Sequence, residues 1–159
     1  MLSRGKVYLE TTVISYLVAR PSRDLRVAAH QQATSEWWIQ KREHFELFVS
    51  QLVIEEASAG DEAAAGRRLK HLEGIKLLDL TEPTVVLAES LLASGAMPRE
   101  AEEDLLHIAL AAVHGMDYLL TWNCKHIANA TMRNRIEAAC SDAGYDSPVI
   151  CTPEELLEE

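Results

Sequence analysis

A glutamate stands directly after a short apolar run near the N-terminus. Val7–Leu9 are typical of a buried strand, and Glu10 follows at the end of that strand, before two threonines. If a helix comes next, Thr11 or Thr12 caps it better than Glu10, because a short hydroxyl side chain reaches back to the free N–H groups. The cap therefore does not require Glu10, and its carboxylate is available for chemistry.

A second acidic group opens the segment EEDLLHIALAAVHG, residues 102–115. Every residue from 105 to 113 except His107 is apolar, which predicts a helix buried on most sides. The helix dipole explains Glu102 and Glu103 in the first turn. Asp104 leads directly into the buried face, so we favour a site role for it. His107 lies one turn further on the same face, and we expect it to orient Asp104 and not to bind metal. The alternative for His107 is a structural histidine bonded to a carboxylate.

A third group of acids lies in the segment SQLVIEEASAGD, residues 50–61. Ser50 is a suitable N-cap for a helix that carries Glu55 and Glu56. Neighbouring helical residues point about 100° apart, so one of the two carboxylates should face solvent and the other can be buried. Periodicity alone does not choose between them.

Polar residues also follow a strand in the segment LLTWNCKHIAN, residues 119–129. A strand ending in Thr121 leads into a loop that contains Asn123, Cys124 and His126. Asn123 is either a site residue or an ordinary turn residue, since asparagine favours turns. A zinc site built on Cys124 and His126 is poorly supported, because the usual paired spacing of zinc ligands is absent.

Short apolar runs alternate with helical patterns along the whole chain. The predicted strands are 7–9, 47–49, 75–78, 118–121 and 149–151, and the predicted helices are 12–19, 24–43, 51–59, 61–73, 82–95, 99–114 and 127–143. This alternation predicts one α/β domain over residues 1–159, a parallel sheet flanked by helices. Ligands of such sheets collect beyond the carboxyl ends of the strands, so we expect Glu10 and Asn123 at the same edge.

Composition sets limits on location and partners. The three cysteines are odd in number and widely spaced, and no leader precedes the first strand, so we expect free thiols and a cytoplasmic protein without a membrane anchor. A net charge of −10 is a poor general match for a nucleic acid backbone. Either the acids cluster to hold cations, or the partner is a basic protein. The local basic patches are interpreted as solvated surfaces: Arg20/Arg23/Arg26, Lys41/Arg42, Arg67/Arg68/Lys70 and Arg133/Arg135.

Four of these motifs occur in an order that resembles a known family. They are YLETTVISYL, SQLVIEE, DLLHIALAA and LLTWNCKHI, and the resemblance that they carry covers residues 6 to about 152. The chain resembles the PIN-domain nucleases, and among them the VapC-like toxin ribonucleases of toxin–antitoxin pairs. The resemblance implies a parallel sheet flanked by helices, a carboxylate site for Mg²⁺ or Mn²⁺, RNA as substrate, an antitoxin protein as partner, and a homodimer.

The resemblance also implies roles for individual residues. Glu10, Glu56 and Asp104 match the three metal-binding acids, and Glu56 is thereby selected over its neighbour. Asn123 and Thr121 match positions that would orient the attacking water, and Thr12 matches a hydroxyl residue two positions after the first acid. Three carboxylates and an asparagine suffice for Mg²⁺, which keeps several of its own waters.

One position departs from the family pattern, in which the first acid is usually aspartate. The extra methylene of Glu10 displaces the carboxylate, and Mg²⁺ tolerates poor geometry badly. Two interpretations stay open: an active ribonuclease that uses Glu10, or a catalytically impaired PIN-like module that binds nucleic acid or protein. A phosphatase or other α/β hydrolase ranks last, because the chain has no nucleophile motif and no Gly-rich phosphate loop.

Overall fold

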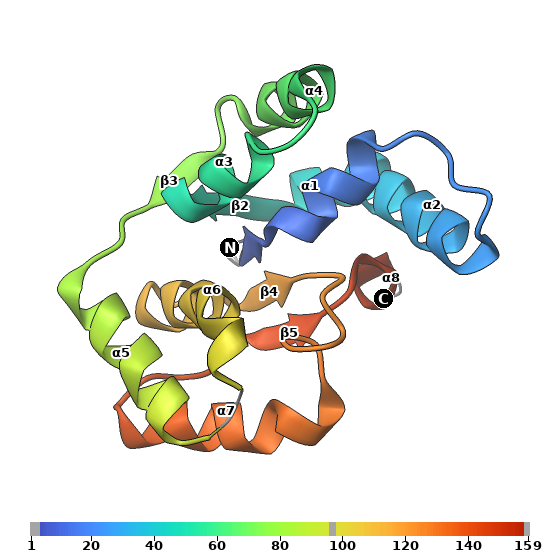
Figure 1. Cartoon of the computed structure of the whole chain (residues 1–159). Coiled ribbons are helices and arrows are strands. Elements are labelled where there is room, and N and C mark those ends of the chain that lie inside the picture. The colour runs from blue at the N-terminus through green and yellow to red at the C-terminus, as the bar shows by residue number, and fades with distance from the viewer. Residues whose placement is uncertain (1–3, 96–97, 158–159) are drawn as a thin grey trace.

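The computed structural model of the protein describes residues 4–95 and 98–157. A sheet of five parallel strands runs through it in the order β3-β2-β1-β4-β5 (Figure 1). The strands are β1 (Gly5–Leu9), β2 (Phe45–Ser50), β3 (Lys76–Leu78), β4 (Tyr118–Leu120) and β5 (Val149–Cys151). The predicted α/β fold with a parallel sheet flanked by helices is confirmed.

The helices form two groups that pack on the sheet (Figure 1). The first group comprises α1 (Thr11–Val18), α2 (Leu25–Gln40), α3 (Gln51–Ala57) and α4 (Glu62–Leu72). The second group comprises α5 (Glu82–Ala93), α6 (Glu102–Val113) and α7 (Ala130–Asp142), and the short α8 (Pro153–Leu157) packs on α2. None of the helices within the described ranges is long and apolar enough to cross a membrane.

The central strand β1 lies at the point where the strand order reverses. The chain leaves β1 for β2 on one side of it and later returns to β4 on the other side. Just beyond the strands, the amide of Glu10 donates to the carbonyl of Leu120 at 3.0 Å, and the amide of Thr121 donates to that of Cys151 at 3.0 Å. Glu10 and Thr121 therefore sit side by side at the carboxyl ends of two adjacent strands, where parallel sheets bind ligands.

The strand ends lie against a closely packed core. Residues 7–9 of β1 and residues 119–120 of β4 are fully buried, as expected for central parallel strands covered on both faces. The predicted burial of α6 on most sides is also confirmed, since residues 107–112 are all buried, His107 included. Side chains at the edge of this core are thus held by elements with little freedom to move.

The predicted cap of the first helix is wrong. Glu10, and neither threonine, occupies the N-cap position of α1, and its carboxylate makes no capping hydrogen bond. The hydroxyl of Thr11 instead bonds Glu56, and the hydroxyl of Thr12 bonds Glu10. Hydrogen bonds to the two acids thus replace the capping bonds that the sequence favours.

Candidate metal centre

Glu10 is buried, with a side chain held by hydroxyl groups. Its Oε1 atom accepts hydrogen bonds from Thr12 Oγ1 and from Thr121 Oγ1, the latter at 2.6 Å. Thr12 Oγ1 in turn accepts from the amide of Trp122 at 2.8 Å. Within the described part of the chain, Oε2 of Glu10 carries no hydrogen bond. One carboxylate oxygen is therefore fixed by the protein while the other remains available to a ligand.

Glu56 approaches from the neighbouring strand and helix. The hydroxyl of Ser50, at the end of β2, accepts from the amide of Val53 at 3.3 Å and so starts α3. Glu55 on this helix is exposed, whereas Glu56 is half-buried and turns inward. Its Oε1 atom accepts from the hydroxyl of Thr11. The structure thus separates the two glutamates as periodicity requires.

The surroundings of Glu56 favour its ionised form. Partial burial would raise the pKa of this carboxyl, but the hydrogen bond and charge of His107 and the hydroxyl of Thr11 outweigh burial, so the net pKa is lowered. Glu56 is therefore a carboxylate at neutral pH, which is the form that binds cations.

His107 does not orient Asp104, and that expectation is wrong. Its Nε2 atom lies 2.8 Å from Oε1 of Glu56, and its Nδ1 atom lies 2.7 Å from the hydroxyl of Tyr8. The same hydroxyl lies 2.8 Å from Oγ of Ser50. Both ring nitrogens are thus engaged inside the protein, and the contacts of His107 position Glu56.

Replacing Tyr8 by phenylalanine should destabilise the fold. The hydroxyl is buried between Ser50 and His107, and its loss leaves a buried ring nitrogen without its partner. We expect the free energy of unfolding in urea to fall by about 1–3 kcal/mol. Tyr118→Phe is the matched control, because the Tyr118 hydroxyl makes no hydrogen bond with the described residues. Equal stability of Tyr8→Phe and wild type would contradict this role for Tyr8.

Asp104 lies in a neighbouring cluster at the start of α6. Its Oδ1 atom accepts from Nδ2 of Asn123 at 3.1 Å, and its Oδ2 atom lies 2.9 Å from Nδ1 of His126. The backbone amide of Asn123 donates to Oγ1 of Thr121 at 2.9 Å, and the hydroxyl of Thr121 donates to Oε1 of Glu10. Among the described residues, no direct contact joins Asp104 to Glu10 or Glu56, but this chain of hydrogen bonds links it to Glu10.

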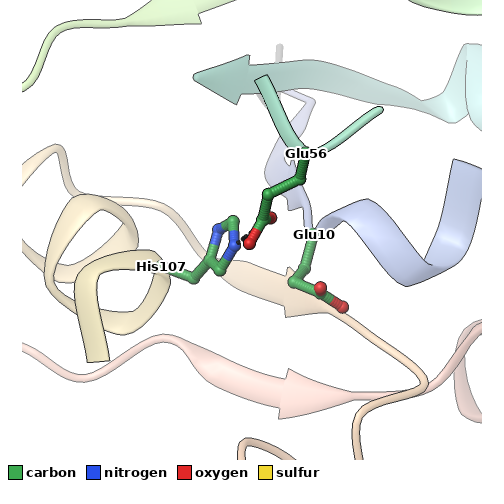
Figure 2. A group of neighbouring side chains, drawn as sticks. All are labelled: Glu10, Glu56 and His107. Carbon is green, nitrogen blue, oxygen red and sulfur yellow. Dashed lines mark hydrogen bonds and ion pairs between the residues drawn. The ribbon is translucent and has the colours of Figure 1, made fainter. Parts of the chain in front are cut away.

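The donor set fits a divalent cation. Ligand atoms of Glu10, Glu56 and His107 lie within 4.8 Å of one another, and no other group of three acids, histidines or cysteines in the described ranges is as close. Both ring nitrogens of His107 are engaged, so the two carboxylates are the groups available to an ion. Figure 2 shows the carboxylate of Glu56 between the His107 ring and Glu10. Neither glutamate is ion-paired to a lysine or arginine of the described residues. Two carboxylates close together, with no lysine or arginine beside them, create a charge that Mg²⁺ or Mn²⁺ would neutralise.

The structure brings in one residue that the sequence did not single out for this site. His126 was considered only as a zinc ligand with Cys124, yet its ring bonds Asp104. This contact joins a loop to the start of α6, and a local sequence pattern gives no signal for it.

One comparison with known proteins identifies the family of this chain. The family model of the PIN domain matches residues 7–126, well over half of the chain. That range contains every residue of the two clusters described above. A comparison with curated proteins found no match. The chain belongs to the PIN-domain family, whose members are generally metal-dependent nucleases.

Proposed function

We propose that this protein is a metal-dependent endoribonuclease and the toxin of a toxin–antitoxin pair. The observation that carries the nuclease is the approach of Glu10 and Glu56 at the end of the central strand, without a lysine or arginine partner. RNA as the substrate, an antitoxin partner, a homodimer and a cytoplasmic location rest on the resemblance to VapC-like toxins.

In the proposed site the acids bind the ion, and neighbouring polar side chains hold the acids in position. Glu10, Glu56 and Asp104 would hold the ion, directly or through water. When bound, a divalent ion neutralises phosphodiester charge and lowers the pKa of a coordinated water. Thr121 holds Glu10, and Asn123 holds Asp104, so both position carboxylates. This is a different role from the direct orientation of water that the resemblance implies for these two residues.

Glu10 is better explained as a working ligand than as a damaged one. Two threonine hydroxyls converge on its carboxylate, and the same carboxylate lies near Glu56. If Glu10 were only a remnant of an inactivated site, nothing would require the hydroxyls of Thr12 on α1 and Thr121 after β4 to hold its carboxylate in one position. The impaired-module interpretation is therefore the weaker of the two.

Metal binding should raise the melting temperature. A ligand that binds only the folded state adds RT ln(1 + [L]/Kd) to stability, about 2.7 kcal/mol when the ligand is at 100 times Kd. Millimolar Mn²⁺ should therefore shift the melting curve of the wild type upward relative to EDTA, and the shift should be much smaller in Glu56→Gln. Identical wild-type curves in Mn²⁺ and EDTA would count against the site.

The substrate class is tested with matched nucleic acids. The purified protein, free of any antitoxin, should cleave a mixed-sequence single-stranded RNA in Mg²⁺ or Mn²⁺ and should leave DNA of the same sequence largely intact. Equal cleavage of RNA and DNA would support a nuclease but would contradict the proposal that it is specific for RNA. The toxin role is tested separately, by growth arrest on expression and its relief by a co-expressed protein from a neighbouring gene.

A further inference from the structure

Three aromatic rings stack beside the acids. Trp122 stands between Thr121 and Asn123 in the chain, and the His30 ring lies 4.1 Å from it with the planes 15° apart. The Tyr16 ring lies 5.9 Å from Trp122 and 6.2 Å from His30, also nearly parallel to both. We name Tyr16, His30 and Trp122 the aromatic stack.

The inner ring of the stack is fixed to the candidate metal centre. Trp122 is buried, and its Nε1 atom donates to Oγ1 of Thr34 at 2.7 Å. Its amide donates to Thr12, which bonds Glu10. Tyr16 follows Thr12 by one turn of α1, about 6 Å along the helix. The stack is thus built directly onto the support of the first acid.

The outer rings of the stack are partly exposed. Tyr16 and His30 are half-buried, and neither the Tyr16 hydroxyl nor a ring nitrogen of His30 bonds a described residue. Tyr16 also borders a groove of ≈ 510 Å³ between α1 and α2, a volume in the range of small-ligand sites. Flat rings with unpaired polar edges suit an unpaired nucleobase, which proteins bind by stacking and edge hydrogen bonds.

Three arginines continue from the stack along the α1–α2 connection. We name residues 20–26 the arginine segment; Arg20, Arg23 and Arg26 in it are exposed, and their side chains make no hydrogen bond or ion pair with the described residues. Arg26 precedes His30 by one turn on α2. In a chain of net charge −10, this is a local surplus of positive charge without an internal partner.

The arginine segment is held in place. The side-chain amide of Gln31 donates to the carbonyl of Arg20 at 3.0 Å and accepts from the amide of Ser22 at 2.9 Å. The carboxylate of Asp24 caps α2 by accepting from the backbone amides of Arg26 and Val27, and it forms no ion pair with a guanidinium group of the described residues. The backbone is therefore organised before a ligand arrives, while the charged side chains stay free.

We propose that the aromatic stack and the arginine segment form the RNA-binding path that leads the strand to the acids. Tyr16 and His30 stack an unpaired base next to the metal centre, and Arg20, Arg23 and Arg26 contact the phosphates that follow. The proposal rests on the proposed ribonuclease function and supplies the phosphate contacts that function needs. Rings that stack on bases and arginines that bind phosphates together match single-stranded RNA. An acidic protein segment would match the arginines but would not require the rings.

RNA binding without cleavage tests this path. Fluorescence anisotropy of a short, labelled, mixed-sequence single-stranded RNA is measured in EDTA over a series of salt concentrations. The triple variant Arg20→Gln/Arg23→Gln/Arg26→Gln should bind about tenfold or more weakly at low salt, and its salt slope should be smaller by roughly 2, at 0.7 for each lost phosphate contact. Tyr16→Leu should weaken binding about tenfold, and Tyr16→Phe should keep it, because the ring provides the stacking.

The control removes the same charge elsewhere. Arg67→Gln/Lys70→Gln/Arg99→Gln changes three exposed cations outside the path and should bind nearly as the wild type does. Equal losses in the two triple variants, wild-type affinity in the arginine-segment variant, or no RNA binding by the wild type would each overturn the proposal. The binding assay contains no metal and records no cleavage, so it tests the path independently of catalysis. If the protein binds RNA through this path but does not cleave RNA when metal is added, the binding path stands and the proposed ribonuclease function is contradicted.

Discussion

Asp104→Asn should lower the rate of RNA cleavage about a thousandfold, a loss of about 4 kcal/mol of transition-state stabilisation. The amide keeps the size of the side chain and can still contact Asn123 and His126, so the fold should persist. It loses the negative charge that holds a divalent ion. The measurement is the initial rate of RNA cleavage in Mn²⁺, with the melting temperature as the check on folding.

Glu102→Gln is the control for Asp104→Asn. Glu102 is an exposed neighbour in the first turn of the same helix and should be replaceable with little effect on cleavage. Glu103→Gln should likewise have little effect, because Glu103 is also exposed in this first turn. Equal losses in Glu102→Gln and Asp104→Asn would show that α6 contributes general negative charge and no specific ligand.

Glu10→Asp should lower cleavage about tenfold or more, as expected for the loss of an oriented interaction of about 1.4 kcal/mol. Thr12 and Thr121 fix the position of the Glu10 carboxylate from two sides. Shortening the side chain by one methylene withdraws the carboxylate from both hydroxyls and from Glu56. The rate should therefore fall although aspartate is the usual residue of the family at this position.

A glutamate elsewhere in the sheet controls for the change in length. Glu46 on β2 is half-buried and forms an ion pair with Lys76 at 2.7 Å. Glu46→Asp should leave the cleavage rate within about twofold of the wild type, because surface ion pairs contribute little. A comparable loss in Glu46→Asp would mean that shortening glutamates in the sheet disturbs the fold in general.

The sequence predicted the sheet because its strands are nearly pure apolar runs. Residues 7–9 and 149–151 stand out against polar neighbours, and the helices between them carry clear apolar faces. The short helix α8 was not predicted, since five residues are too few for helical periodicity. Helix α2 ends at Gln40, before the predicted residue 43, and residues 42–44 form a short 3₁₀ helix instead.

The site was predictable as a set of acids but not as a set of contacts. Glu10 was predicted because it directly follows a buried strand, and Asp104 because it lies in the first turn of a helix and leads into its buried face. The partner of His107 was wrong because helical spacing relates residues within one helix, whereas Glu56 approaches from α3. The contact of His126 with Asp104 and the stacking of His30 on Trp122 likewise depend on how separate elements pack.

The most direct test of the account is the rate of RNA cleavage as a function of Mn²⁺ or Mg²⁺ for the wild type and Glu10→Asp. Both proteins are purified free of antitoxin and given the same mixed RNA pool. The account predicts cleavage by the wild type that requires the ion, saturates with its concentration and stops in EDTA, with a rate about tenfold or more lower in Glu10→Asp. An inactive wild type together with cleavage by Glu10→Asp would contradict it and identify the natural protein as an impaired binding module.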